Sequence, residues 1–192
     1  MFAQLDTKSV YSFMDSVVDL NSYVARAKEL GYQALGLMDR DNLYAAYHFA
    51  QLASRNGLRP LIGMEANLFY EGRKIPFRLL AKNNQGYKNL MKLATELSSG
   101  QREFTAFSDY LNAIALILPS EDWEPGMTLG SEVFIGVRPE DAGKEFDYPV
   151  VPLHTVRYFE NADRSTIQML HAISQNVSLS EASICPMNQL LF

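Results

Sequence analysis

The chain has 192 residues, a formal net charge of -5 and 47% hydrophobic residues, which fits one sizeable domain of a soluble globular protein. Its longest apolar run, Ala113–Leu118, is far too short to span a bilayer, and the N-terminus lacks the basic and apolar regions of a signal peptide. The acidic balance argues against a dedicated nucleic-acid-binding module. The single cysteine, Cys185, excludes an internal disulfide, and the three histidines are too few for a histidine-rich metal centre.

The first half of the chain predicts alternating strands and helices. In chain order, these are a strand at 1–6, a helix at 20–30, a strand at 34–38, a helix at 43–56 and strands at 60–69 and 75–81. Asp19 or Asn21 is expected to cap the first helix, and Gly31 and Gly57 to end the two helices. The turn at 71–73 is too short to hold a helix, so strands 3 and 4 are expected to form a short β-hairpin.

The second half continues this alternation. Its predicted elements are a helix at 85–97, a short helix at 105–111, strands at 113–118, 133–137 and 150–154, and a helix at 161–175. Residues 120–130 are predicted to form a loop, whose Trp123 is interpreted as a surface residue. About seven strands that alternate mostly with helices indicate an α/β protein with a largely parallel sheet or an incomplete barrel.

Ionisable and other polar residues follow several of the predicted strands, where parallel α/β folds place their sites. They are Asp6, Lys8 and Asp15 after the first strand, Asp39, Arg40, Asp41 and Asn42 after the second, Glu65 on the third, and His154, Thr155 and Arg157 at the last. A solvated rim with chance salt bridges is the alternative interpretation.

The sequences of these segments and their order along the chain resemble the N-terminal PHP (polymerase and histidinol phosphatase) domain of bacterial DNA polymerase III alpha subunits. The resemblance is carried by "FAQLDTKSVYSFMDS" (2–16), "RAKELGYQALGLMDRDNLYAAYHF" (26–49), "RPLIGMEANL" (59–68), "RLLAKNNQGYKNLMKL" (78–93) and "PVVPLHTVRYF" (149–159). It implies a distorted (β/α)7 TIM-like barrel over residues 1–176, followed by a tail at 177–192 that leads towards a polymerase core outside this chain.

Metal-binding members of this family hold Zn²⁺ or Mn²⁺, and the resemblance also shows where this sequence departs from them. The His-x-His pair is replaced by Asp6 and Lys8, the Asp-His pair by Asp39 and Arg40, and the final Asp-x-His by Thr155 and Arg157. A further family histidine falls at Pro76 or Phe77, whereas Glu65 is retained and Asp15 lies nearby. Lysine and arginine are cations without an acceptor lone pair. We therefore expect no metal site, and hypothesise that salt bridges of Lys8, Arg40 and Arg157 with the remaining carboxylates have replaced the metal centre.

The other candidate residues carry weaker signals. His48 and His171 fall within helices and are interpreted as packing or surface residues, and His154 is the only histidine expected to be within reach of a metal. Cys185 lies in the tail and is interpreted as an inert thiol. No catalytic and no cofactor-binding residue is expected in this chain.

Three functions remain open. In the favoured one, the chain belongs to a cytoplasmic, replicative DNA-directed DNA polymerase (a nucleotidyltransferase) that uses Mg²⁺ at an active site outside these residues. The domain is then a non-catalytic module that packs on the polymerase core of the same chain, with DNA contacted through the parent protein, a proofreading exonuclease and other replisome subunits as candidate partners, and no membrane. The alternatives are an active metal-dependent phosphoesterase or 3′–5′ exonuclease with a reduced acidic site, and a free-standing phosphatase related to histidinol phosphatases.

Overall fold

The computed structural model describes residues 3–130, 132–141 and 143–182, which form two compact units. Of these residues, the first unit contains 3–39, 44–61 and 154–182, and the second contains 40–43 and the rest of 62–153. Cys185 and most of the predicted tail lie outside the described residues. Each unit is therefore built from segments that are distant in sequence.

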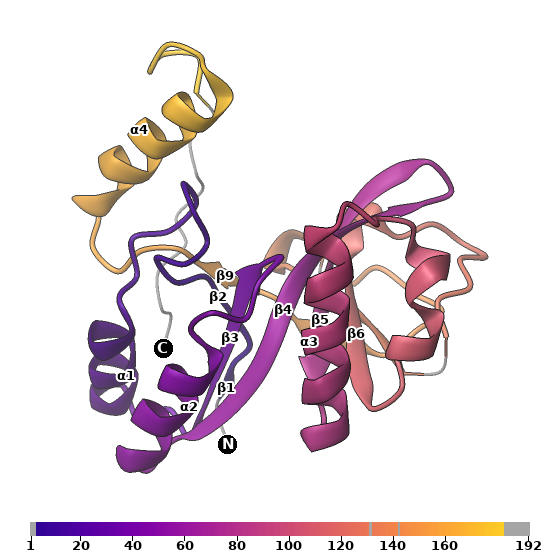
Figure 1. The fold of residues 1–192 in the computed structure, drawn as a ribbon. Coiled ribbons are helices and arrows are strands. Elements are labelled where there is room, and N and C mark those ends of the chain that lie inside the picture. The colour runs from indigo at the N-terminus through magenta and orange to yellow at the C-terminus, as the bar shows by residue number, and fades with distance from the viewer. Residues whose placement is uncertain (1–2, 131, 142, 183–192) are drawn as a thin grey trace. The chain divides into compact units, whose positions relative to one another are not determined.

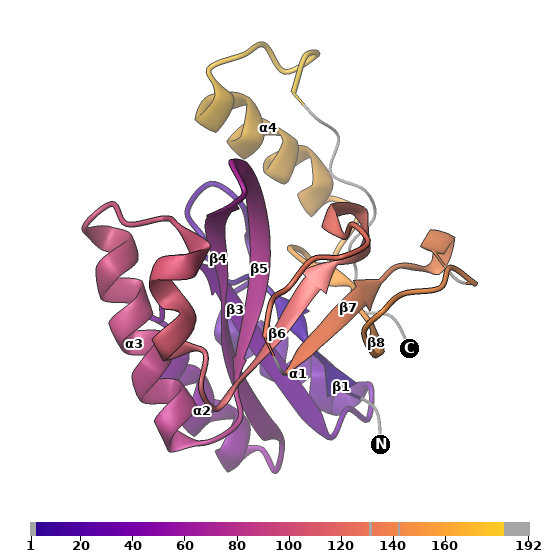
Figure 2. The ribbon, with the colours of Figure 1, turned by 90° about the vertical axis from the view of Figure 1, so that its right-hand side faces the viewer.

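The first unit contains short parallel strand pairs and three helices (Figures 1 and 2). Strand β1 (Ala3–Gln4) pairs in parallel with β3 (Ala34–Arg40), and β2 (Asp6–Thr7) pairs in parallel with β9 (Thr155–Val156). Helices α1 (Leu20–Glu29) and α2 (Ala46–Arg55) lie side by side, and α4 (Asp163–Gln175) follows β9. Asp19 caps α1, and Gly31 and Gly57 adopt positive φ angles just beyond α1 and α2, which confirms these predicted helix boundaries.

The second unit contains most of β4 (Arg59–Tyr70) and the strands β5 (Arg73–Ala81), β6 (Ile114–Pro119), β7 (Val133–Val137) and β8 (Val150–Pro152). Its helices are α3 (Asn84–Ser98) and the short 3-10 helices η1 (Phe104–Tyr110), η2 (Ser120–Asp122) and η3 (Pro139–Asp141). Strand β5 is antiparallel to both β4 and β6, whereas β6, β7 and β8 are parallel. The strand order of the sheet is β1-β3-β4-β5-β6-β7-β8.

The α/β fold agrees with the prediction, and most strand pairs are parallel. The antiparallel pairs are those of β5 with β4, across the turn at 71–73, and of β5 with β6. Two predictions about strand bounds were wrong. The strand predicted at 1–6 is divided at Leu5, whose carbonyl oxygen approaches Gly36 so closely that a Cβ there would lie 1.9 Å from it. The strand predicted at 150–154 is divided into β8, which pairs with β7, and β9, which pairs with β2. The barrel remains a prediction of the family resemblance.

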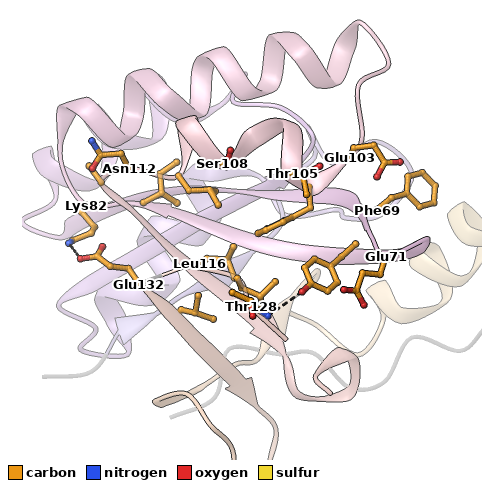
Figure 3. A pocket seen from close by; sticks show the side chains of 18 of the residues that line it. Phe69, Glu71, Lys82, Glu103, Thr105, Ser108, Asn112, Leu116, Thr128 and Glu132 are labelled. Carbon is orange, nitrogen blue, oxygen red and sulfur yellow. Dashed lines mark hydrogen bonds and ion pairs between the residues drawn. The ribbon is translucent and has the colours of Figure 1, made fainter. Parts of the chain in front are cut away.

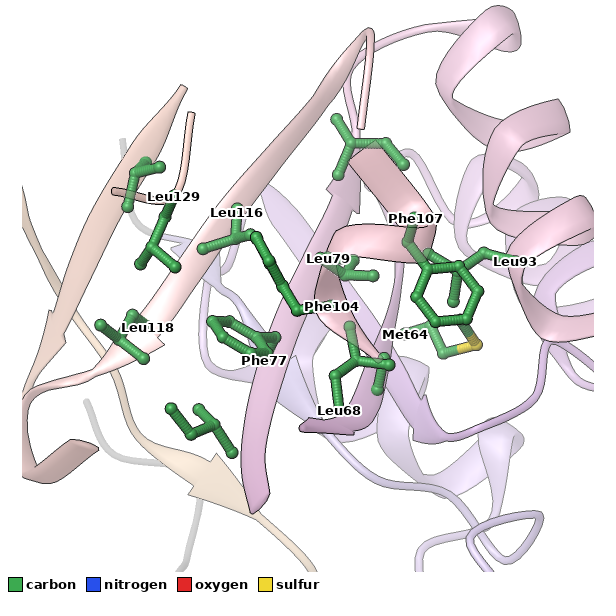
Figure 4. Close-up of a cluster of buried hydrophobic side chains, with 14 of the residues drawn as sticks. Met64, Leu68, Phe77, Leu79, Leu93, Phe104, Phe107, Leu116, Leu118 and Leu129 are labelled. Atoms are coloured by element: carbon green, nitrogen blue, oxygen red, sulfur yellow. The ribbon is translucent and has the colours of Figure 1, made fainter. Parts of the chain in front are cut away.

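The core of the second unit lies between its sheet and the helices α3 and η1 (Figure 4). Leu90, Leu93 and Leu97 form the buried stripe of α3, as the spacing of these leucines predicted. Trp123 packs against this core and meets Phe146 edge to face, with ring centroids 5.2 Å apart. Trp123 does lie on the predicted loop, but its ring is partly buried against this core rather than fully exposed, because an indole ring gains from apolar contact.

Two helix caps allow a matched test. Replacing Asp19 with alanine is expected to lower the free energy of unfolding by about 1 kcal/mol at neutral pH, because Asp19 Oδ1 accepts hydrogen bonds from the backbone N–H groups of Asn21 and Ser22. Hydrogen bonds from the side chain and backbone of Ser22 hold the pKa of Asp19 below its usual value. Its contribution is therefore present above the unfolded-state pKa and lost as the pH falls through the lowered folded-state pKa.

Asn83, the cap of α3, is the control for this pH dependence, since its neutral side chain accepts from the N–H groups of Gln85 and Gly86. Urea unfolding at neutral and at acidic pH should show a similar loss for Asn83→Ala at both pH values. The loss for Asp19→Ala should shrink in acid. An equal loss for Asp19→Ala at both pH values would contradict the assigned role of its charge.

Candidate functional site

A buried cluster surrounds Asp6 on β2 in the first unit. Lys8 has no exposed surface, and its Nζ donates to Asp6 Oδ1 at 2.8 Å and to the Met38 carbonyl oxygen at 2.6 Å. Thr155, opposite Asp6 on β9, donates through its hydroxyl to Asp6 Oδ2 at 2.7 Å. Each Asp6 carboxylate oxygen thus has a donor of its own, and the buried ammonium compensates the buried charge.

Asp39, near the end of β3, is held by the loop that follows β2. Its carboxylate accepts from the Ser9 backbone N–H and hydroxyl and from the Ser12 hydroxyl, each at 2.7 Å. The Asp39 side chain is buried, with 2% of its residue surface exposed. These three short hydrogen bonds indicate that the Asp39 carboxylate fixes the conformation of the loop.

Asp15 lies at the meeting point of the loop, the segment after β9 and helix α4. Its Oδ1 accepts from Arg157 Nε at 3.1 Å and lies 3.2 Å from His171 Nε2. Arg157 and His171 are mostly buried, with 17% and 15% of their side-chain surfaces exposed. His171 was predicted as a packing or surface residue. The structure adds a polar contact with Asp15 that sequence reasoning missed, because the two residues lie far apart in the chain.

A second buried cluster, in the second unit, surrounds Glu65 on β4. Arg40 Nε lies 3.1 Å from Glu65 Oε1, and Arg78 NH2 lies 3.3 Å from Glu65 Oε2. Arg78 also donates from NH1 to the Pro76 carbonyl oxygen at 2.6 Å, so Pro76 contributes its backbone to this cluster. Sequence reasoning missed Arg78. Its signal was an arginine within the otherwise apolar predicted strand at 75–81, a position that requires a charged partner.

Beside this cluster, Asp41 and Arg102 form a further ion pair at 2.7 Å. Asp41 Oδ1 also accepts from the Asn67 backbone N–H at 3.1 Å. With Arg40, Phe69 and Lys74, these residues line a hollow of about 480 Å³. The ion pair thus joins Asp41 to Arg102, which lies just before η1, within the second unit.

The side chains of these clusters do not form a set of ligands that fits a metal ion. Within residues 3–130, 132–141 and 143–182, no three His, Cys, Asp or Glu side chains are grouped so that they could hold one. Asp6, Asp15 and Glu65 each direct a carboxylate oxygen at a cationic nitrogen or at an imidazole instead. A metal ligand must present a free lone pair at about 2.0–2.2 Å from the ion, and an ammonium or guanidinium group has none.

The two other histidines lie on α2 and beside the β2–β9 pair. His48 is exposed on α2. His154 is half-buried between β8 and β9, and its carbonyl oxygen accepts from the Gln4 side chain at 2.6 Å. The contact with Gln4 places the His154 backbone at the start of the β2–β9 pair.

Comparisons with known proteins identify relatives over the whole chain. Residues 4–124 match the PHP domain family. The chain is 45% identical over 193 aligned residues to DNA polymerase III subunit alpha of Streptococcus pyogenes serotype M1, covering 100% of this chain and 19% of that protein. It is 33% identical over 126 residues to DNA polymerase III subunit alpha of Bacillus subtilis, covering 62% of this chain and 11% of that protein.

Among solved structures, an amidohydrolase from Chromobacterium violaceum matches with a TM-score of 0.47 and 10% identity, over 64% of this chain and 69% of the other. The chain spans about a fifth of the length of the curated relatives from Streptococcus. Within the described part of the chain, no helix combines the length and the hydrophobicity needed to cross a membrane.

Proposed function

The chain belongs to the PHP domain family, and on this premise we propose that it is the N-terminal PHP domain of a replicative, cytoplasmic DNA-directed DNA polymerase. The identity of 44–45% to DNA polymerase III alpha subunits, over the whole of this chain, supports this proposal. Nucleotidyl transfer with Mg²⁺ then takes place at carboxylates in the polymerase core, outside these residues. The family's distorted (β/α)7 barrel, with a short hairpin between β4 and β5, is part of the same proposal.

We propose further that this domain is not catalytic, and the observation that carries the proposal is the buried pair of Lys8 and Asp6. Family members with metal centres have histidines where this chain has Lys8, Arg40 and Arg157. A buried ammonium at 2.8 Å from a carboxylate repels a divalent ion from that carboxylate and supplies the positive charge in its place. Arg40 and Arg78 likewise supply positive charge to Glu65 and repel a divalent ion from it. Arg157 has this effect at Asp15.

The first unit also exposes apolar side chains that suit a role in interaction. Phe13 is 80% exposed on the loop after β2, and Tyr44 is 80% exposed before α2. Ile173 on α4 is 58% exposed. Such side chains are available for contact with another protein surface. The proposed partners are the polymerase core of the same chain and, through it, DNA, a proofreading exonuclease and other replisome subunits.

Metal analysis and activity assays test the non-catalytic role. The purified chain is expected to carry no stoichiometric zinc or manganese, and to hydrolyse neither p-nitrophenyl phosphate nor single-stranded DNA in manganese faster than its Glu65→Gln variant. Equal background rates for both proteins would show that Glu65 supports no reaction. Bound metal together with turnover that Glu65→Gln abolishes would instead favour the alternative, a metal-dependent phosphoesterase or 3′–5′ exonuclease.

A primer-extension assay tests the parent activity separately. The longer polypeptide that contains this chain is expected to extend a primed DNA template with magnesium, whereas the isolated chain is not. Absence of a polymerase core from the parent coding sequence would overturn the polymerase assignment and favour a free-standing phosphatase.

A further inference from the structure

An elongated groove runs through the second unit, between η1 on one side and β6 with the start of β7 on the other (Figure 3). Its volume is about 930 Å³, which is within the range of sites that hold a ligand the size of a short peptide. The groove is distinct from the clusters around Asp6 and Glu65, because none of their residues lines it.

The connection between β6 and β7 explains why this groove exists. Neighbouring parallel strands are usually joined by a crossover helix that covers the sheet. Here β6 and β7 are parallel neighbours, but the described residues between them contain only the three-residue helix η2. No crossover helix therefore covers this part of the sheet, and the edge of the buried core, at Leu116, Leu129 and Val133, forms the apolar floor of the groove.

The two ends of the groove differ in charge. At one end Lys82 and Glu132 form an ion pair and compensate each other. At the other end lie Glu71, in the turn between β4 and β5, and Glu103, which precedes η1 (Figure 3). Three glutamates and one lysine line the groove, which gives it a net charge of -2, concentrated at the Glu71 end.

The walls of the groove are held by hydrogen bonds within the unit. The Tyr70 hydroxyl accepts from the Thr128 backbone N–H at 3.1 Å, and the Tyr148 hydroxyl donates to the Met127 carbonyl oxygen at 2.8 Å. Thr105 and Ser108 of η1 are exposed along the opposite wall and offer hydroxyl groups to a ligand. A site formed before binding avoids part of the entropy cost of ordering its own loops.

We propose that this groove binds a short amphipathic segment of a partner protein. The apolar side chains of that segment contact the floor at Leu116 and Leu129, and a lysine or arginine lies at the end formed by Glu71 and Glu103. The charge of the groove favours a basic segment over an acidic one, and its apolar floor favours an amphipathic segment over a uniformly charged one. This proposal is independent of whether the domain binds metal.

Selection of phage-displayed random peptides on the purified chain tests the proposal. Enriched peptides are expected to combine apolar residues with a lysine or arginine. Their affinity should fall at least about tenfold for Ser108→Trp, which fills the groove, and about fivefold for the double variant Glu71→Gln, Glu103→Gln. Selection on Glu71→Lys, Glu103→Lys should enrich acidic peptides instead.

Matched controls separate these effects from a loss of folding. Ala106→Trp places the same ring on an exposed position of η1 outside the groove lining, and Glu96→Gln removes an exposed charge from α3. Both controls should retain peptide affinity. Failure to enrich peptides, or enrichment of peptides that bind all variants equally, would overturn the proposal. Self-association of the chain that Ser108→Trp abolishes would also overturn it, because the occupant would then be a second copy.

Discussion

Replacing Lys8 with methionine is expected to lower the free energy of unfolding by about 3–5 kcal/mol. Lys8 and Asp6 have no exposed surface, so the substitution leaves the Asp6 charge buried next to the Thr155 hydroxyl without its ammonium. Urea unfolding at neutral pH, followed by circular dichroism, measures this loss.

A second substitution distinguishes the lost ion pair from lost packing. Asp6→Asn in the Lys8→Met background removes the unpaired Asp6 charge and should recover most of the lost free energy of unfolding. Replacement of both members of a buried ion pair by uncharged groups often changes stability little. Lys28→Met, on the exposed face of α1, should change stability by less than about 0.5 kcal/mol. A double variant no more stable than Lys8→Met alone would attribute the effect to packing.

Arg78→Met is expected to lower the free energy of unfolding by about 2–3 kcal/mol, and Arg40→Met by less than about 1 kcal/mol. The two arginines contact the same carboxylate, but the Arg78 side chain is 8% exposed and the Arg40 side chain is 40% exposed. Water screens the more exposed pair and solvates Glu65 when Arg40 is removed, whereas removal of Arg78 leaves a buried oxygen without its guanidinium.

Comparison of these variants in wild-type and Glu65→Gln backgrounds isolates the interaction with Glu65. The difference between Arg78→Met and Arg40→Met should become smaller once the Glu65 charge is absent. If Arg40→Met proves more destabilising than Arg78→Met in the wild-type background, burial does not determine the strength of these pairs.

Helices were easier to predict from this sequence than strand directions. Leu90, Leu93 and Leu97 repeat at the helical period, and Asp19 caps a helix through bonds to residues that are neighbours in the chain. The short turn at 71–73 indicated an antiparallel partner for the run 75–81, whereas no local pattern indicated the direction of β6 against β5. Likewise, the division at 150–154 depends on separate partners, β7 and β2, that sequence pattern does not reveal.

The candidate site was predictable where local spacing or family motifs apply. Asp6 and Lys8 are two residues apart, a spacing that places side chains on one side of an extended chain. Arg78 lies outside the family's ligand positions, and it meets Glu65 only through the pairing of β4 with β5. The contact of His171 with Asp15 joins residues 156 positions apart, so no local sequence pattern predicts it.

The pairing of β2 with β9 has a consequence for synthesis of the protein. Asp6 and Thr155 are 149 positions apart, and they must meet before the first unit is complete. Strand β2, which is synthesised early, therefore cannot pair until β9 has been synthesised. Strands β4, β5 and β6, in contrast, pair with strands nearby in sequence. The N-terminal segment, with Lys8 and its charge still hydrated, is thus expected to remain open to chaperones and proteases until residue 156 has emerged.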